Sequence, residues 1–535
     1  MRMNDYTSHY DAWIAYLRGT TFVPPYIDNA FWPFRTSVSY ADAMPLFAIV
    51  FKAISGLFRI KEDFQFFSAV SLLNNALTTA AVFFLAGKLR LKPITPILLL
   101  SVLFVTPVMT QRILIHEALS FQCIVIWAVI LSLLNIKIFT PWVILLCASV
   151  GIHPYFLPMV IVMMVATILA GGTEYWISPE LLNAKNLAKI LLKGLVVALL
   201  LFFSAWIFGL SVTNTSVNVS NQIWDMNLFA LLDPQQTSAL LPALSINMPY
   251  EWEGYSYLGI GLSILAVIYL SQRYFSPASS SHSFLRMQKL VPSKMAWLSV
   301  ILLAIYALGP NIHIGHSHVA SLDFLVTKLH GFTPYAFFRS TGRYVWPLYY
   351  MLVIVLIVNS SERKDVLKRL AIVSVALYLI EVGLPYMKSV DVAFDARLAD
   401  GERIQHEDHM LANELSTLLR NGPEVVSTVP GIPKAEAVSI YSISRELIRM
   451  KILNNFTPFL ARYPEGWFEM LNQATTSFLN RDDIAHLIQN QNIQFLLPIG
   501  GTDHMPKQLH IQEATYQLGA VVRGSTVESV RYEPR

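Results

Sequence analysis

The feature that most constrains the fold of this chain is a succession of apolar segments between residues 66 and 386. Ten of them are candidate membrane spans, at 66–87, 93–111, 117–136, 140–152, 154–172, 186–210, 255–272, 295–310, 344–360 and 369–386. Charged residues make up only 14% of the chain, whereas they make up about 25% of an average soluble domain. The sequence therefore predicts a mainly α protein, a polytopic bundle of transmembrane helices.

Two apolar segments carry features that modify this bundle. His153-Pro154 divides 140–152 from 154–172, because proline removes a backbone donor and disfavours one continuous helix. The run Leu46–Phe58 is short and contains Lys52, which favours an interfacial or re-entrant helix over a span. Cys123 and Cys147 lie inside apolar segments, and we interpret both as small core residues without a disulfide or zinc motif.

Basic residues indicate the orientation of the spans. Lysine and arginine concentrate around 88–92, 185–189, 286–294 and 363–369, and these positions alternate correctly if all are cytoplasmic. The segment 211–254 contains neither residue, which is typical of an extracytoplasmic loop. The same alternation places 1–65, 112–117, 311–343 and everything after about 387 outside. Because nothing in 1–65 would export that segment, we expect one more transmembrane helix upstream of Met1 in the natural gene.

The end of the chain has a different composition, with the charged and polar content of an ordinary soluble protein. Val425–Val429 and Ile493–Pro498 are typical of buried strands, and Glu407–Arg420 and Asp482–Asn490 are typical of helices. We therefore expect three regions. They are an extracytoplasmic first loop with interfacial helices (1–65), a transmembrane bundle (66–390) and a small extracytoplasmic α/β domain (391–535).

Two acidic residues of the first loop, Asp5 and Asp42, lie among aromatic residues and prolines and are candidates for chemistry. A carboxylate at an extracytoplasmic membrane face can act as general base on an acceptor hydroxyl. Asp5 has no obvious structural role, although Asp11 and Asp28 are nearby competitors. Asp42 has a structural alternative, because aspartate is a favoured cap for a helix that begins near Pro45.

Arginines in the outer loops are candidates for binding phosphate. Arg339 and Arg343 are spaced i,i+4, so on a helix they would share a face at the outer end of a span. The planar fork of donors on arginine suits phosphate, which needs fixed positive charge when it leaves. Arg112 is a further candidate. The alternative is that these side chains anchor a helix at the level of the lipid headgroups.

Other polar residues of the outer loops have two interpretations each. His116 and Glu117 are too few to specify a metal site. One interpretation is that they orient the substrate, and the other is that Glu117 is the first residue of a helix. His153 is a functional intramembrane residue, or it is satisfied by a carbonyl freed by the following proline. Glu253 and Tyr255 belong to an acidic and aromatic cluster that holds an acceptor sugar or forms an interfacial belt.

The partners and cofactors that the residues indicate are few. His313, His316 and His318 have a spacing that suits a divalent ion, so a divalent metal is possible, and no other cofactor is indicated. No basic block is long enough for nucleic-acid binding. Membrane lipids are expected partners of the apolar segments.

Several motifs, taken in order, resemble a known superfamily. The elements Asp5 with His9 and Trp13, Trp32-Pro33-Phe34, and Ser39 to Leu46 are similar to the first extracytoplasmic loop of membrane glycosyltransferases of the C superfamily (GT-C). More narrowly, they resemble a bacterial family of uncharacterised polytopic proteins related to them. Segments Arg112–Leu119, Glu253–Gly259 and Phe338–Pro347 add to the resemblance, which covers about residues 1–390.

This resemblance implies an activity at the outer face of the bacterial inner membrane. A sugar would pass from a polyprenyl-phosphate-linked donor, with inversion, to a glycan, lipid or protein acceptor of the cell envelope. It implies a first-loop aspartate as the base, which we take to be Asp5. We expect Asp42 to be the second residue of the catalytic site, where it positions the donor or acceptor. The expected substrate-binding residues are His9, Arg112, His116, Glu117, His153, Glu253, Tyr255, Arg339 and Arg343. The alternatives are a transporter or flippase of lipid-linked saccharide and a non-catalytic scaffold with the same fold.

Overall fold

The computed structural model describes most of the first 388 residues and short strands beyond them. The described residues are 4–30, 36–109, 112, 116–171, 175–177, 183–210, 224–235, 237–244, 251–274, 288–322, 338, 340–363, 366–388, 425–428, 448–449, 453–454, 493–497, 517–523 and 526–531. For residues 4–8, and for the strands beyond residue 424, the structure describes the backbone alone.

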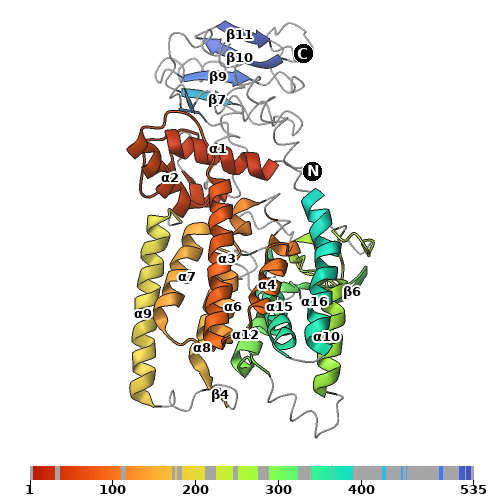
Figure 1. The fold of residues 1–535 in the computed structure, drawn as a ribbon. Helices are drawn as coiled ribbons and strands as arrows, with labels where there is room; N and C mark the ends of the chain where they lie inside the picture. The colour runs from red at the N-terminus through yellow and green to blue at the C-terminus, as the bar shows by residue number, and fades with distance from the viewer. Residues whose placement is uncertain are drawn as a thin grey trace. The chain divides into compact units, whose positions relative to one another are not determined.

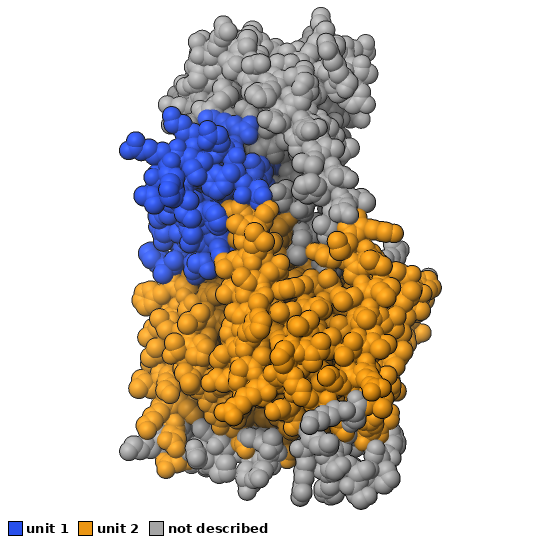
Figure 2. All heavy atoms as spheres, in the orientation of Figure 1, with its two compact units in different colours: residues 1–65, 205–218, 394–535 blue, residues 66–204, 219–393 orange. Residues whose placement is uncertain are grey.

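The chain divides into two compact units (Figure 2). Unit 1 comprises Met1–Gln65, Ala205–Asn218 and Phe394–Arg535, and unit 2 comprises Phe66–Ser204 and Val219–Ala393. The sequence places the end of the first loop at residue 65, where unit 1 is interrupted. It places the end of the bundle at 390, close to the second boundary at 393.

Unit 2 is a bundle of apolar helices (Figure 1). In chain order they are α3 (Phe67–Leu89), α4 (Ile94–Leu103), α6 (Cys123–Leu133), α7 (Phe139–Ile152), α8 (Phe156–Leu169), α9 (Ala184–Ile207, its last turn in unit 1), α10 (Gly259–Tyr274), α12 (Lys294–Ala307), α15 (Trp346–Ser361) and α16 (Val366–Tyr378). Each of the ten apolar segments identified in the sequence overlaps one of these helices. Nearly all of α15 is buried among its neighbours, whereas α9 exposes most of its apolar side chains.

Membrane-spanning length is reached by four helices of the described chain. They are Phe67–Leu89, Ala188–Ile207, Thr341–Ser361 and Val366–Lys388, and the remaining apolar helices have 10–17 residues. A helix rises 1.5 Å per residue, so it needs about 20 residues to cross a hydrocarbon core of about 30 Å. The protein is therefore mainly helical, with apolar helices that could span a membrane, and the expectation of ten spans is met in part.

The break predicted at His153-Pro154 is confirmed. Helix α7 ends at Ile152 and α8 begins at Phe156, and His153 between them has an extended backbone, as expected for a residue that precedes proline. Both cysteines are free, Cys123 buried in α6 and Cys147 half-buried in α7.

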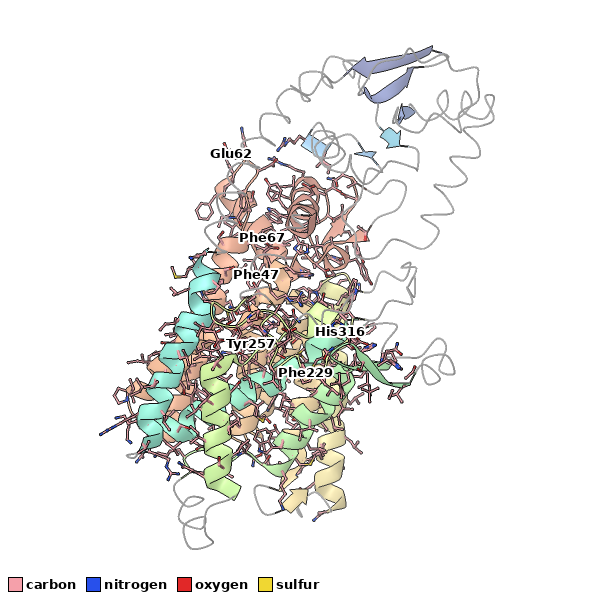
Figure 3. All side chains as sticks on the ribbon, turned by 90° about the vertical axis from the view of Figure 1, so that its right-hand side faces the viewer. Phe47, Glu62, Phe67, Phe229, Tyr257 and His316 are labelled. Atoms are coloured by element: carbon pink, nitrogen blue, oxygen red, sulfur yellow. The ribbon has the colours of Figure 1, made fainter. Side chains whose placement is uncertain are left out.

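Helix α16 continues into a π-helical turn, η6 (Leu379–Gly383), which contains a fully buried carboxylate. Glu381 accepts hydrogen bonds from Ser238 Oγ at 2.9 Å and from the backbone N of Ile260 at 2.7 Å. It also accepts one from the hydroxyl of Tyr257, which lies inside unit 2 (Figure 3). Glu381 thereby ties the end of α16 to the loop that precedes α10.

The first 65 residues contain short elements joined by turns. They are α1 (Asn4–Arg18), β1 (Tyr26–Ile27), β2 (Thr36–Ser37), a 3₁₀ turn η1 (Val38–Ala41) and α2 (Pro45–Phe58). Proline stands in the first turn of α2 as predicted, but the N-cap residue is Met44 and no side chain caps this helix. The capping interpretation of Asp42 is therefore wrong, because Asp42 lies before the cap and ends η1 with a left-handed backbone (φ 52°).

The charge that interrupts α2 has a structural partner in α1. Lys52 Nζ donates to the backbone oxygens of Tyr16 at 2.5 Å, Gly19 at 2.9 Å and Thr21 at 2.7 Å. It also lies 4.2 Å from the centroid of the Tyr16 ring. These carbonyls belong to the last turn of α1 and the residues after it, where helical partners run out. Lys52 is therefore a cap for α1, and the helix predicted at Leu46–Phe58 is present as α2.

Beyond residue 393, the described strands form one five-stranded sheet in the order β11-β10-β9-β7-β8. Its strands are β7 (Val425–Thr428), β8 (Leu453–Asn454), β9 (Ile493–Leu497), β10 (Gln517–Arg523) and β11 (Thr526–Arg531). Strand β7 pairs in parallel with β8 and β9, and β10 pairs antiparallel with β9 and β11. Strands β7 and β9 occupy the two ranges that the sequence predicts as strands. The predicted helices at 407–420 and 482–490 lie outside the described residues, so the α/β assignment stays a prediction.

Candidate functional site

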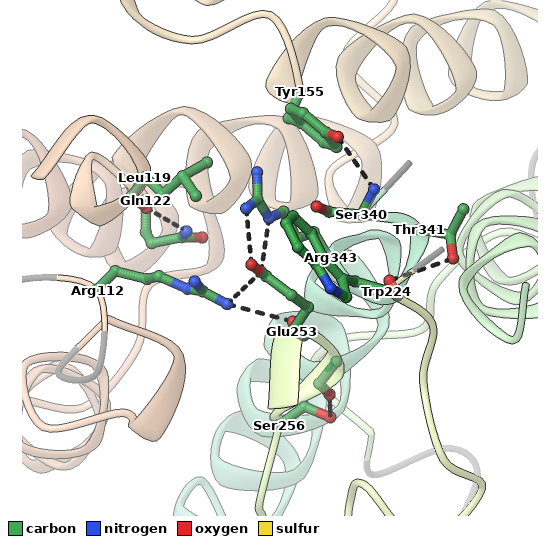
Figure 4. A network of polar contacts seen from close by, with 11 residues as sticks. Arg112, Leu119, Gln122, Tyr155, Trp224, Glu253, Ser256, Ser340, Thr341 and Arg343 are labelled. Carbon is green, nitrogen blue, oxygen red and sulfur yellow. Dashed lines mark hydrogen bonds and ion pairs between the residues drawn. The ribbon is translucent and has the colours of Figure 1, made fainter. Parts of the chain in front are cut away.

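A buried group of three charged side chains lies in unit 2, where loops between apolar helices meet (Figure 4). Arg112 Nη2 donates to Glu253 Oε2 at 2.6 Å. Arg343 donates from Nε to the same oxygen at 2.7 Å and from Nη2 to Oε1 at 2.9 Å. Two arginines from distant parts of the chain therefore share one carboxylate. We call Arg112, Glu253 and Arg343 the charged triad.

Two short 3₁₀ turns bring Glu253 and Arg343 together. Glu253 lies in η4 (Glu251–Gly254), and Arg343 lies in η5 (Thr341–Val345), which leads directly into α15. A Cβ atom on Gly342 would lie 2.7 Å from the backbone N of Gly254 and 2.8 Å from the backbone O of Asp225. A residue with a side chain would push the two turns apart, so glycine at 342 permits the approach that closes the triad.

Aromatic rings flank the two guanidinium groups. Arg343 Cζ lies 4.4 Å from the centroid of the Tyr155 ring, and Arg112 Cζ lies 5.6 Å from the centroid of the Trp346 ring. Both distances are in the range of cation–π attraction. The Tyr155 hydroxyl also accepts a hydrogen bond from the backbone N of Ser340 at 3.1 Å, which holds the chain that enters η5 (Figure 4).

The charged triad carries an excess of positive charge. Burial alone would raise the pKa of Glu253, but the charges of Arg112 and Arg343, with the hydrogen bond from Arg343, outweigh it and lower the pKa to about 2. Glu253 is therefore ionised at neutral pH. One carboxylate and two guanidinium groups leave a formal charge of +1 in a region shielded from water. Such a group favours an anionic ligand beside it.

Two histidines extend the triad towards the junction of α7 and α8. The rings of His116 and His153 have centroids 5.3 Å apart, and His153 lies 5.3 Å from Tyr155. The charge of His116 also contributes to the lowered pKa of Glu253, and its backbone N donates to Arg112 O at 2.7 Å. The structure therefore places five of the predicted substrate-binding residues in one connected group: Arg112, His116, His153, Glu253 and Arg343.

The other candidates of unit 2 have different surroundings. Glu117 is buried and is the first residue of the 3₁₀ turn η2 (Glu117–Ser120), a position that fits its interpretation as a helix start. Tyr255 is buried and its hydroxyl donates to Pro234 O at 2.9 Å, so it anchors the loop before η4. Arg339 lies outside the described residues. The helix face that it was expected to share with Arg343 is not formed, because η5 begins only at Thr341 and Ser340 before it has a non-helical backbone (φ −89°, ψ 68°).

The first-loop candidates belong to unit 1. Asp5 lies in α1 by its backbone, and its side chain lies outside the described residues. His9 is one helical turn further along α1, so the two residues share a face of that helix. His9 is buried, and one of its ring nitrogens lies within 4.8 Å of a carboxylate oxygen of Asp42. An imidazole beside a carboxylate is an arrangement that can move a proton.

The histidine-rich segment forms a β-hairpin of β5 (Asn311–Ile314) and β6 (Ser317–Ser321). His313 and His318 are cross-strand partners with ring centroids 5.3 Å apart, and His316 is exposed in the turn. Two facing histidines are fewer ligands than a structural metal site needs. Asp323, the nearby carboxylate, lies outside the described residues, so the metal stays a prediction.

The sequence did not single out Tyr155 and Gly342, which support the charged triad, or Glu381, which is a buried carboxylate outside it. Tyr155 and Gly342 act through neighbours that are distant in the sequence, so no local pattern singles them out. Glu381 had a detectable signal, because it is the acidic residue in the apolar segment 369–386. Ionisable residues inside such segments are functional candidates by default.

Comparison with known proteins places the chain in a family. No curated protein and no solved structure matches it. Residues 1–381 match the model of a family described as a domain of unknown function, DUF6311, and the chain belongs to that family.

Proposed function

We propose that this protein is a membrane glycosyltransferase of the GT-C type in the cytoplasmic membrane of a bacterium. It transfers a sugar from a polyprenyl-phosphate-linked donor to a cell-envelope acceptor on the outer side. The observation that carries the proposal is the charged triad, in which Arg112 and Arg343 share the single carboxylate of Glu253. The triad is proposed to bind the phosphate of the donor lipid.

The contacts of the triad suit a phosphate that gains charge as it leaves. Electrostatic catalysis needs donors that are oriented before the reaction, in a place from which water is excluded. The Glu253 carboxylate orients Arg343 through two hydrogen bonds. Arg112 donates one hydrogen bond to this carboxylate and a longer one to the backbone O of Glu253. The remaining formal charge of +1 complements an anion. Tyr155 and Trp346 line the same arginines.

The proposed reaction is an inverting displacement at the anomeric carbon. The acceptor hydroxyl gives its proton to a carboxylate, and its oxygen forms a bond to the anomeric carbon. The bond from that carbon to the phosphate oxygen breaks, and the electron pair leaves with the phosphate. We assign the base to Asp5. Asp42, with His9 beside it, is assigned to positioning the donor or acceptor.

Sugar transfer in proteoliposomes tests the proposal. A panel of labelled polyprenyl-phosphate sugars would be given to wild type, Asp5→Asn and Arg343→Lys. Loss of a general base typically costs a factor of about 10²–10⁴. Arg343→Lys keeps the positive charge but loses the planar guanidinium group that donates two parallel hydrogen bonds, so the rate of sugar transfer should fall by a factor of about 10–100. Arg18→Lys is the matched control, because Arg18 pairs with Asp63 in a partly exposed position. Wild-type rates in Asp5→Asn would remove Asp5 as the base.

A second function, transport of a lipid-linked saccharide, is favoured by Glu381. This carboxylate is fully buried within the candidate span Val366–Lys388, at a π-helical turn. Ionisable residues inside transmembrane spans mark substrate and ion pathways, and π-helical turns are frequent at functional sites. The same proteoliposomes distinguish the two functions. Movement of labelled donor between leaflets without sugar transfer, abolished by Glu381→Gln and kept by Asp5→Asn, would favour the transporter.

A further inference from the structure

A groove between α7 and α9 in unit 2 is separate from the charged triad. It is an open groove of about 280 Å³, lined by Phe139, Thr140, Val143, Ile144, Val196 and Val197, with Lys193 as the charged residue among them. Helix α7 begins at Phe139 and ends at Ile152, next to His153 of the candidate site. The groove is lined by the first half of α7, from Phe139 to Ile144. At 1.5 Å per residue, it therefore lies about 14–21 Å along the helix from His153.

The groove combines one cation with an apolar slot. Lys193 lies within the candidate span Ala188–Ile207, and its Nζ is 4.8 Å from the centroid of the Phe139 ring. That span is the least buried of the four long helices, so the surface beside the groove is apolar and open. A lysine near the end of a span lays its stem along apolar surface and directs its ammonium group towards the headgroups. A ligand of matching chemistry has an apolar chain and an anionic head.

Further lysines surround the same end of the bundle. Lys189 is exposed one turn before Lys193 on α9, so the two share a helix face. Lys137 is exposed just before α7, and its Nζ donates to Ala170 O at 2.6 Å. Basic pockets between membrane helices bind the headgroups of anionic lipids.

We propose that the α7–α9 groove binds an anionic phospholipid, with an acyl chain along Val143 and Val196 and the headgroup phosphate at Lys193 Nζ. Free phosphate has no apolar part to cover the valines of the groove, so we assign the site to a lipid. The site does not depend on the proposed function, because it uses none of the residues of the charged triad.

Native mass spectrometry of the detergent-purified full chain tests this site. Phosphatidylglycerol and phosphatidylcholine are titrated separately into wild type, Lys193→Gln, Val196→Trp and Lys88→Gln. Lys88 is the matched control, because its Nζ lies 5.6 Å from the Phe84 ring at the end of α3 without lining the groove. We expect Lys193→Gln to weaken phosphatidylglycerol binding about fivefold and to leave phosphatidylcholine unchanged. Val196→Trp fills the slot and should remove the first bound lipid.

Each variant can overturn the proposal. Equal losses in Lys193→Gln and Lys88→Gln would show general attraction to a basic surface, and unchanged binding in Val196→Trp would show that no chain enters the groove. Because Val196 is about half exposed, its replacement by tryptophan should leave the fold intact, which circular dichroism checks. Competition by millimolar inorganic phosphate would contradict the requirement for a lipid chain.

Discussion

Arg343 holds Glu253 through two parallel hydrogen bonds, from Nε to Oε2 at 2.7 Å and from Nη2 to Oε1 at 2.9 Å. The carboxylate is almost fully enclosed, and Arg112 binds it from the other side. A buried ion pair need not stabilise a fold more than apolar residues of the same shape. Removing one partner is different, because it leaves the other charges buried without compensation.

Glu253→Gln should therefore destabilise the protein strongly. It leaves two buried guanidinium groups facing an uncharged side chain, and such losses cost about 3–5 kcal/mol. Denaturant unfolding in detergent measures the change in free energy of unfolding. Asp63→Asn is the control, because its partners Arg18 and Arg449 are about one-third exposed, and partly exposed pairs contribute about 1 kcal/mol or less. Equal losses of unfolding free energy in the two variants would contradict the conclusion that burial makes the triad more sensitive than a partly exposed ion pair.

The lowered pKa of Glu253 predicts a specific acid sensitivity. Burial opposes the shift, but the two arginines lower the pKa from 4.5 to about 2 in the folded protein. Because the folded pKa lies below the unfolded one, the stabilisation is fully present above about pH 4.5 and is lost as pH falls towards 2. The unfolding free energy of wild type should drop towards that of Glu253→Gln over this range. A constant difference between the two proteins from pH 6 to pH 2.5 would contradict the assignment.

Gly342→Ala tests the packing that closes the triad. The added Cβ would overlap backbone atoms of Gly254 and Asp225, and overpacking of this kind costs about 1–3 kcal/mol. Gly87→Ala in α3 is the matched control, because a Cβ there has no atom within 4 Å. Alanine at 87 should leave stability unchanged or raise it by up to about 1 kcal/mol. If Gly342→Ala is as stable as Gly87→Ala, η4 and η5 are not held together by close backbone contact.

The helices of unit 2 follow from local sequence, and the triad does not. Apolar runs of 13–25 residues predict helices wherever they occur, and Pro154 predicts the break between α7 and α8. The triad joins residues 141 and 90 positions apart, and nothing local shows which of several arginines meets Glu253. The local sequence was misleading at Asp42. Aspartate shortly before Pro45 fits the pattern of a helix cap, but the N-cap residue of α2 is Met44. The local sequence therefore predicts which residues are candidates for a site, and the long-range contacts of the fold decide which of them meet.

Lys52→Met should loosen the end of α1, the helix that carries His9. Methionine keeps the length and apolar stem of the side chain but leaves the oxygens of Tyr16, Gly19 and Thr21 without the ammonium donor. A hydrogen bond to a charged group contributes a net free energy of about 1.5–3 kcal/mol, and water reaches the half-buried site when the ammonium group is removed, so we expect a loss of about 2 kcal/mol. Hydrogen exchange of residues 17–22 should accelerate, whereas Lys61→Met, at an exposed position, should leave it unchanged. Unaltered exchange in Lys52→Met would mean that water replaces the ammonium group without cost and that α1 ends without a cap.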